Sequence, residues 1–207
     1  CYHVFITEGL SSATVLDGIT ITGGKADGSS MIIYSGQNYY QNSGGGMRNH
    51  GSSPTLTDVT ICGNTAANYG GGIFNRLSSS PTLTNVTISD NTATDFGGGM
   101  YNYASSPTLT NVTISGNTAA SNGGGIYNYS SSSPTITNTL FWGNKKGTSS
   151  TLAGADIYNN ISTTNITYSL VQLASSSYTS GNNNFLTTNT NMVYATDPSF
   201  VNASDPD

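Results

Sequence analysis

The sequence predicts an all-β fold, a right-handed parallel β-helix built from three-strand solenoid coils of 26–27 residues. One motif recurs from Pro54, Pro81, Pro107 and Pro134, at spacings of 27, 26 and 27 residues, and such periods are typical of solenoids. Within each repeat, apolar and polar residues alternate in short runs, which is the period of a strand and not of a helix.

One repeat illustrates the expected elements in order. The first run, residues 82–84, points Leu83 inward between two outward threonines. Asn85 breaks the alternation, as a corner would, because asparagine tolerates a left-handed backbone. The second run, residues 86–88, is again apolar inward, and a polar corner and a Gly-Gly-Gly loop lead to the third run, residues 100–102.

Stacking such coils at about 4.8 Å places equivalent residues in ladders. Buried asparagines in a stack can pass side-chain amide hydrogen bonds from coil to coil, so their polarity is satisfied. One asparagine ladder is expected at a corner and one beside the glycine turn: Asn64, Asn91, Asn117 and Asn144; and Asn49, Asn75, Asn102, Asn128 and Asn159.

We expect the β-helix to cover residues 1–171, and an irregular, Asn-rich segment, residues 172–207, to close the same domain. Gly44 follows Gly24 by 20 positions, whereas Gly70 follows Asn64 by six. This difference predicts an inserted loop at about residues 25–43, which would project from a turn.

The ends of the sequence lead to a further expectation. It opens directly on strand-like residues 2–7 and ends at Asp207 without an obvious cap. We therefore expect it to be a piece of a longer polypeptide.

Composition narrows the function. Five Lys and Arg stand against ten Asp and Glu, giving a net charge of −5, which argues against nucleic acid as a partner. No apolar run has the length of a membrane span. The two cysteines and the scattered carboxylates predict neither a metal site nor a cofactor, because Asp58, Asp90 and Asp95 fall on different columns of the coil alignment.

The best candidates for binding lie in the inserted loop and in one column after the glycine-side asparagine ladder. Aromatic faces and arginines suit sugar rings and carboxylates, so the column, expected to be exposed, predicts a small sugar-binding platform. The alternative is a solvent-facing strand exit where varied side chains are tolerated. The candidates are Tyr34, Tyr39 and Tyr40 in the loop, and His50, Arg76, Tyr103 and Tyr129 in the column, with Arg48 two residues from His50.

Two other outward columns have a structural and a functional interpretation. Phe74, Tyr101, Tyr127 and Tyr158 follow Arg48 and predict an aromatic stack, which would stabilise the solenoid or contact a ligand. Outward Thr-x-Thr pairs recur in the first run of each repeat. They resemble the threonine arrays of ice-binding solenoids, although threonine is also simply a good residue for an exposed strand.

Short motifs carry a resemblance to a known family. Two glycines followed by an aliphatic residue, as in the motif Gly-Gly-Ala-Ile, occur at Gly71-Gly72-Ile73 and Gly124-Gly125-Ile126. Residues 141–144 match a second motif, Phe-x-x-Asn. In these motifs the chain resembles bacterial parallel β-helix repeat proteins of cell surfaces, including anchor-bearing ones and, more distantly, the polymorphic outer-membrane proteins of chlamydiae. The resemblance implies a cell-surface adhesin or passenger role.

We therefore expect an extracellular or cell-surface structural β-helix that acts as a rigid stalk, filament element or adhesin passenger and is not an enzyme. Its partners would be surface glycans, a host or cell-surface receptor, or copies of itself. The alternative is a carbohydrate-active β-helix, either a polysaccharide lyase or hydrolase or a glycan-binding portion of one.

Overall fold

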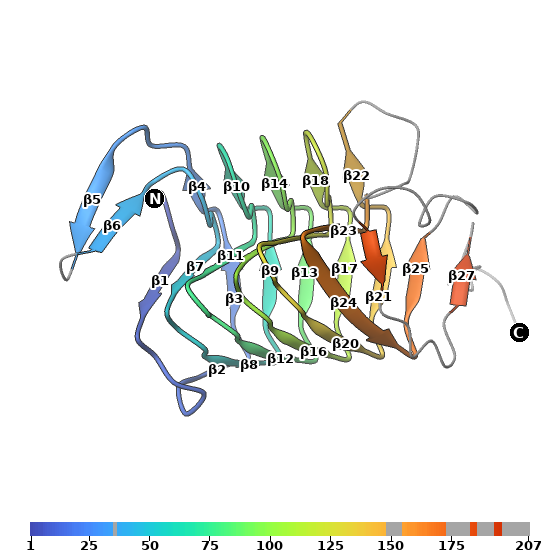
Figure 1. Cartoon of the computed structure of the whole chain (residues 1–207). Coiled ribbons are helices and arrows are strands. Elements are labelled where there is room, and N and C mark those ends of the chain that lie inside the picture. Colours follow the sequence, from blue (N-terminus) through green and yellow to red (C-terminus); the bar gives the residue numbers. More distant parts are fainter. Residues whose placement is uncertain (35–36, 148–154, 173–182, 186–192, 196–207) are drawn as a thin grey trace, which may run out of the picture.

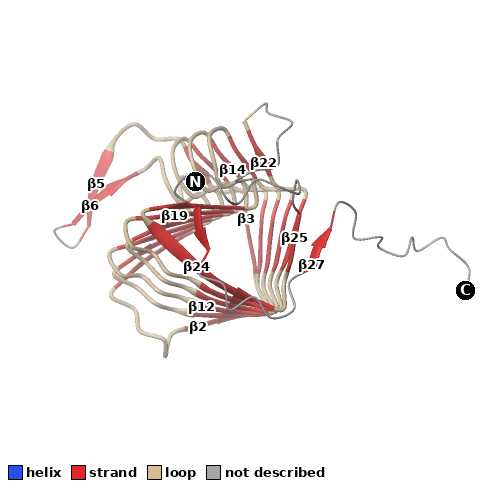
Figure 2. Ribbon diagram, turned by 45° about the vertical axis from the view of Figure 1, so that its right-hand side comes forward, coloured by secondary structure: helices blue, strands red, loops and turns tan. Residues whose placement is uncertain are grey.

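The computed structural model describes residues 1–34, 37–147, 155–172, 183–185 and 193–195. These residues form a parallel β-solenoid, shown from the side in Figure 1, with no helix among them. The expected all-β parallel β-helix is confirmed. Four stacks of parallel strands make its walls, and a separate antiparallel hairpin stands out from the N-terminal end (Figure 2).

The four sheets are named A to D. Sheet A contains β1 (Phe5–Glu8), β7 (Met47–His50), β11 (Ile73–Arg76), β15 (Met100–Tyr103), β19 (Ile126–Tyr129) and β23 (Ile157–Asn160). Sheet B contains β2 (Val15–Asp17), β8 (Thr55–Thr57), β12 (Thr82–Thr84), β16 (Thr108–Thr110), β20 (Thr135–Thr137), β24 (Ser162–Thr167) and β26 (Asn183–Phe185). Sheet C contains β3 (Thr20–Thr22), β9 (Thr60–Cys62), β13 (Thr87–Ser89), β17 (Thr113–Ser115), β21 (Leu140–Trp142), β25 (Leu170–Gln172) and β27 (Val193–Ala195). Sheet D contains β4 (Lys25–Ala26), β10 (Thr65–Ala66), β14 (Thr92–Ala93), β18 (Thr118–Ala119) and β22 (Lys145–Lys146).

Sheet D adds to the expected coil. The segment between the second corner and the glycine triplet reads as a loop in the sequence, but it contains a two-residue strand in each successive coil. Each complete coil therefore passes through sheets B, C, D and A in turn. The buried alanine of β14, Ala93, pairs with Ala66 and Ala119 and lines the interior on this side.

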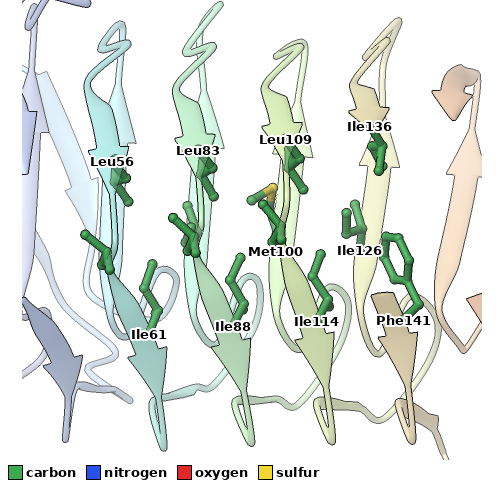
Figure 3. Close-up of a cluster of buried hydrophobic side chains, with 14 of the residues drawn as sticks. Leu56, Ile61, Leu83, Ile88, Met100, Leu109, Ile114, Ile126, Ile136 and Phe141 are labelled. Atoms are coloured by element: carbon green, nitrogen blue, oxygen red, sulfur yellow. The ribbon is translucent and has the colours of Figure 1, made fainter. Parts of the chain in front are cut away.

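The core is a set of apolar ladders from sheets A, B and C (Figure 3). Leu83 of sheet B pairs in register with Leu56 and Leu109, and all three are fully buried. In sheet C, Ile88 pairs in register with Ile61 and Ile114. The flanking threonines point outward, as the alternation predicts, so the period-2 pattern defines the core of the described coils.

The predicted corner geometry is also present. Asn85, Asn111 and Asn138 adopt positive φ angles of 57°, 57° and 50°. Gly18 occupies the same corner in the first coil, at φ 63°. The corner is left-handed in each case, which explains why Asn and Gly recur there.

Both asparagine ladders are confirmed. Asn75 Nδ2 donates to Asn102 Oδ1 at 2.8 Å, and Asn102 Nδ2 donates to Asn128 Oδ1 at 2.8 Å. At the corner ladder, Asn91 Nδ2 donates to Asn117 Oδ1 at 3.0 Å and to the Ile61 carbonyl at 2.9 Å. These amides are fully buried, so the interior contains continuous hydrogen-bonded lines beside its apolar ladders.

The inserted loop forms a two-stranded antiparallel hairpin, β5 (Met31–Tyr34) and β6 (Gln37–Tyr40). It leaves the solenoid after β4 and returns just before β7, at the N-terminal end (Figures 1 and 2). The C-terminal segment, predicted to be irregular, contains two strands, β26 and β27. They extend sheets B and C by pairing with β24 and β25.

Candidate functional site

A hollow of about 420 Å³ lies on the outer face of sheet A, beside the base of the hairpin. Its walls come from the hairpin, the loops before two glycine triplets, and strands β7, β11, β15 and β19. The lining residues are Tyr40, Asn42, Ser43, Arg48, Asn68, Tyr69, Phe74, Arg76, Tyr101, Tyr103 and Tyr129. Its volume falls within the range of small-molecule sites in proteins.

The predicted aromatic stack runs beneath this hollow and on along sheet A. Phe74 and Tyr101 have ring centroids 5.5 Å apart, and Tyr101 and Tyr127 stack at 5.1 Å with an interplanar angle of 7°. Tyr127 and Tyr158 continue the stack at 5.3 Å and 12°. Burial raises the pKa of Tyr101 and of Tyr127, so both hydroxyls remain protonated.

A second aromatic layer, not predicted from the sequence, covers the first. Tyr69 stacks on Tyr101 at 4.8 Å, and the Phe96 ring lies 4.6 Å from that of Tyr127. Both residues stand immediately before a glycine triplet, and Tyr69, Phe96 and Asn122 are bridged in register. That recurrent position was the signal that could have revealed this layer.

Arg48 lies at the end of the stack and is only 1% exposed. Its guanidinium carbon sits 4.8 Å from the ring centre of Phe74 and 5.6 Å from that of Tyr39. Nη1 donates to the Ser43 carbonyl at 3.3 Å, whereas Nε is buried without an acceptor among the described residues. Burial, and then the charge of Arg76, lower the pKa of Arg48 to about 10, so it stays cationic at neutral pH.

The column through His50 is in register as predicted, but its expected exposure is wrong at its first member. His50 is 6% exposed because the Tyr39 ring covers it, with centroids 5.1 Å apart. Arg76 and Tyr129 are half-buried, and Tyr103 is 36% exposed. Burial and then the charge of Arg76 lower the pKa of His50, which favours its neutral form at pH 7.

The structure brings most of the sequence-predicted site residues together. Tyr40, Arg48, Arg76, Tyr103 and Tyr129 line the hollow. The Tyr39 ring contacts both Arg48 and His50. The side chain of Tyr34 lies outside the described residues. Whether any of these residues binds a ligand stays a prediction.

The hollow has two cations and no carboxylate in its lining. The nearest acid in the register is Glu8, which pairs with His50 on the far side from Arg76. In the described part of the chain the ion pair found is Lys25 with Asp27, at 3.0 Å, away from Arg48 and Arg76. The positive charge of the hollow is therefore not neutralised by a salt bridge.

No group of three His, Cys, Asp or Glu side chains within the described ranges is placed to hold a metal ion. No helix in that part of the chain is long and apolar enough to span a membrane.

The outward threonines form regular rows on sheet B. Thr82 pairs with Thr55 and Thr108, and Thr84 pairs with Thr57 and Thr110, in one continuous register. They are exposed or half-buried. The predicted threonine rows are confirmed, and ice binding by them stays a prediction.

Comparison with known proteins adds one finding. A family model described as "Right handed beta helix region" matches residues 10–204. No curated protein and no solved structure matches the chain. The match covers the hairpin, the whole lining of the hollow and every described solenoid strand except β1.

Proposed function

Because the chain belongs to the right-handed β-helix family, we propose that it is a rigid segment of an extracellular, bacterial cell-surface protein. In this proposal it acts as an adhesin passenger that presents a glycan-binding or receptor-binding pocket. The solenoid supplies a stiff support, and the hollow beside the hairpin supplies the contact.

The observation that carries this proposal is the position of the hollow. The coils between Pro54 and Pro134 are nearly identical in sequence, so each presents almost the same side chains and none forms a chemically distinct site. The hollow lies where the hairpin interrupts that repetition. Binding sites are frequently built on such departures from a regular scaffold.

The chemistry of the lining supports glycan binding. Tyr103 and Tyr40 are exposed, so part of each ring is accessible to a ligand. Asn42 and Asn68 offer amide donors and acceptors beside them. Aromatic faces flanked by amides and arginines match the alternating apolar and hydroxylated faces of a sugar ring.

The rigidity of the scaffold supports the passenger role. Hydrogen-bonded ladders cross the interior, and the low content of charged residues leaves a surface of Ser, Thr and Asn. A solenoid of this kind holds a site at a fixed place along a rod.

The test is binding to cells and to a glycan array with Tyr40→Ala/Tyr103→Ala and, as a control, Tyr168→Asn. Tyr168 is 54% exposed at a distant corner of positive φ, where asparagine fits. Loss of binding in the first variant with retention in the control is expected. Equal binding by the parent and both variants would contradict the proposal.

The same hollow supports a second candidate, a carbohydrate-active enzyme or its binding portion, because the lining suits an acidic polysaccharide as well as a surface glycan. Release of unsaturated sugars, followed by ultraviolet absorbance, measures that activity. Turnover that Tyr40→Ala/Tyr103→Ala abolishes would favour the enzyme over the adhesin.

A further inference from the structure

We propose that the hollow recognises a sugar that carries a carboxylate, with Arg48 and Arg76 binding the carboxylate and the sugar ring lying against the tyrosines. This inference rests on the proposed glycan-binding function and specifies the class of ligand.

Arg48 is a buried cation without a carboxylate partner among the described residues. A buried guanidinium normally pairs with a carboxylate, because transferring an unpaired charge out of water is costly. Arg48 is almost fully buried, yet its Nε has no acceptor among the described residues and its Nη1 has only a long bond to a backbone carbonyl. Contacts with Tyr39 and Phe74 rings hold the guanidinium in place but do not neutralise it.

A second arginine, Arg76, lines the same hollow from the neighbouring coil. β7 and β11 pair Phe74 with Arg48 and Arg76 with His50, so the two arginines lie on adjacent strands of one face. Their positive charges repel each other, and an anion bound between them would offset that repulsion. These are two of only five Lys and Arg in a chain of net charge −5.

Among the described residues, the acid nearest to these arginines in the register is Glu8, which stands beside His50 on β1 and forms no ion pair with Arg48 or Arg76. Residues 28–57, which include the hairpin and β7, contain no Asp or Glu. The lining of the hollow contains no carboxylate, and the ion pair of the described part is Lys25 with Asp27. The missing partner is therefore expected to come from the ligand.

The remaining lining favours a sugar over an acidic peptide. Tyr69 and Tyr103 present aromatic faces next to the arginines, and Asn42 and Asn68 present amides suited to hydroxyl groups. A pyranose ring bearing a carboxylate offers an apolar face, hydroxyls and a charge within one small unit. Arginine binds such a carboxylate through two parallel hydrogen bonds.

The test is calorimetric titration of the whole chain with a galacturonate tetrasaccharide and with its methyl ester, which keeps the ring and removes the charge. Sialyllactose and lactose form a second pair that distinguishes a sialic acid from a uronic acid. We expect one acidic member to bind at least tenfold more tightly than its neutral partner. Equal affinity within both pairs, or equal binding of an oligoglutamate, would overturn the inference.

Variants assign the effect to the arginines. Arg76→Gln and Arg48→Met are expected to reduce affinity for the acidic sugar at least tenfold, with little change for its neutral partner. Lys145→Gln, at the exposed position of β22 in sheet D, is the control for loss of a positive charge and should bind like the parent. Thermal unfolding of each variant excludes loss of fold as the cause, and undiminished binding by both arginine variants would contradict the proposal.

The two proposals can fail separately. If neutral glycans bind and Tyr40→Ala/Tyr103→Ala abolishes that binding, the glycan pocket stands and the requirement for a carboxylate fails. If neither the tyrosine nor the arginine variants alter binding to cells or sugars, the pocket itself is not the site.

Discussion

Asn102 lies in the middle of the buried amide ladder on sheet A. Its Oδ1 accepts from Asn75 and its Nδ2 donates to Asn128, both at 2.8 Å. Asn102→Ala would leave one buried donor and one buried acceptor unsatisfied. We expect this variant to lose about 2–5 kcal/mol of unfolding free energy, measured by urea denaturation.

A matched control exists at the surface. Asn111 belongs to an exposed amide ladder, accepting from Asn138 at 3.3 Å and donating to Asn85 at 3.2 Å. Asn111→Gly removes that amide and preserves the left-handed corner at φ 57°. Its loss should stay within about 1 kcal/mol, because water replaces exposed hydrogen bonds. Equal losses for the two variants would show that burial is not the deciding factor.

Asp156 is a buried carboxyl at the end of the corner ladder. It is 1% exposed, its Oδ1 accepts from Asn144 at 2.8 Å, and its Oδ2 has no partner among the described residues. Burial raises the pKa of Asp156 to about 7, although hydrogen bonds from the Asn144 side chain and from the Gln172 backbone oppose that shift. The folded protein therefore holds this proton up to near neutrality.

This shift predicts a pH dependence of stability. An unfolded aspartate titrates near pH 3.9, so between about pH 4 and 7 the folded state binds one more proton than the unfolded state. The contribution of Asp156 is therefore fully favourable below pH 4 and is lost as the pH rises through 7. In the parent, the unfolding free energy should therefore fall by an amount on the order of a few kcal/mol between pH 4 and 7. In Asp156→Asn this fall should be absent.

Denaturant titrations of parent and variant across pH 4–8 make the measurement. The difference between the two profiles isolates Asp156, because His3 and His50, whose pKa values burial lowers, are common to both. Parallel profiles would contradict the assignment.

Individual residues were predictable where a local pattern decides their place. Asn85 follows from the break in alternation, and Leu83 from the alternation itself. The burial of Arg48 and His50 was not predictable in this way, because Tyr39 covers them. Tyr39 belongs to the inserted hairpin, which lies outside the repeat pattern.

Among the elements, the hairpin β5–β6 is the one that the repeat does not require. The solenoid strands β4 and β7 continue their sheets without it, since their partners are β10, β1 and β11. Replacing residues 29–41 with a short Gly-Ser linker should leave the far-ultraviolet circular dichroism of the solenoid unchanged. It should abolish binding at the hollow, because Tyr40 and the covering Tyr39 are removed.

The matched control for that deletion is Ile33→Ser, on the exposed edge of β5. Ile33 is 72% exposed, so this change keeps the hairpin and its contacts with Arg48. Binding to cells should persist in the control. Unchanged binding after the deletion would exclude the hairpin from the site.

Strand elements were predictable in proportion to their length. Runs of three or more residues, such as β12 and β15, contain enough alternation to show which side faces inward. The strands of sheet D have two residues each, which is too short for a period to appear. The hairpin was expected as a loop because Ser35-Gly36, the dipeptide between its two runs, is a weaker hairpin signal than Asn-Gly or Asp-Gly.

At the scale of the whole molecule, stability should depend on the number of stacked coils. In a solenoid each coil contacts only its neighbours, so an added internal coil contributes one more interface of the same kind. A second copy of residues 81–106 inserted after Ser106 should fold and lengthen the rod by about 4.8 Å. The slope of unfolding free energy against denaturant should increase with the added buried surface.

The control carries the same insertion with Leu83→Asp and Ile88→Asp in the added copy. Its coil cannot bury an apolar interior, so it should loop out or lower the stability of the whole rod. An unchanged denaturant slope in the intact insertion would show that the extra coil does not join the stack.

The amide ladders also give the rod a direction. Along sheet A, Thr7 Oγ1 donates to Asn49, Asn49 donates to Asn75, and the same sense continues to Asn159. The corner ladder runs the same way, from Asn64 through Asn91, Asn117 and Asn144 to the carboxyl of Asp156. Aligned amide dipoles add and polarise one another, so the two lines make the interior electrically polar along its axis. Two such rods lying side by side would therefore attract when they point in opposite directions and repel when they point in the same one.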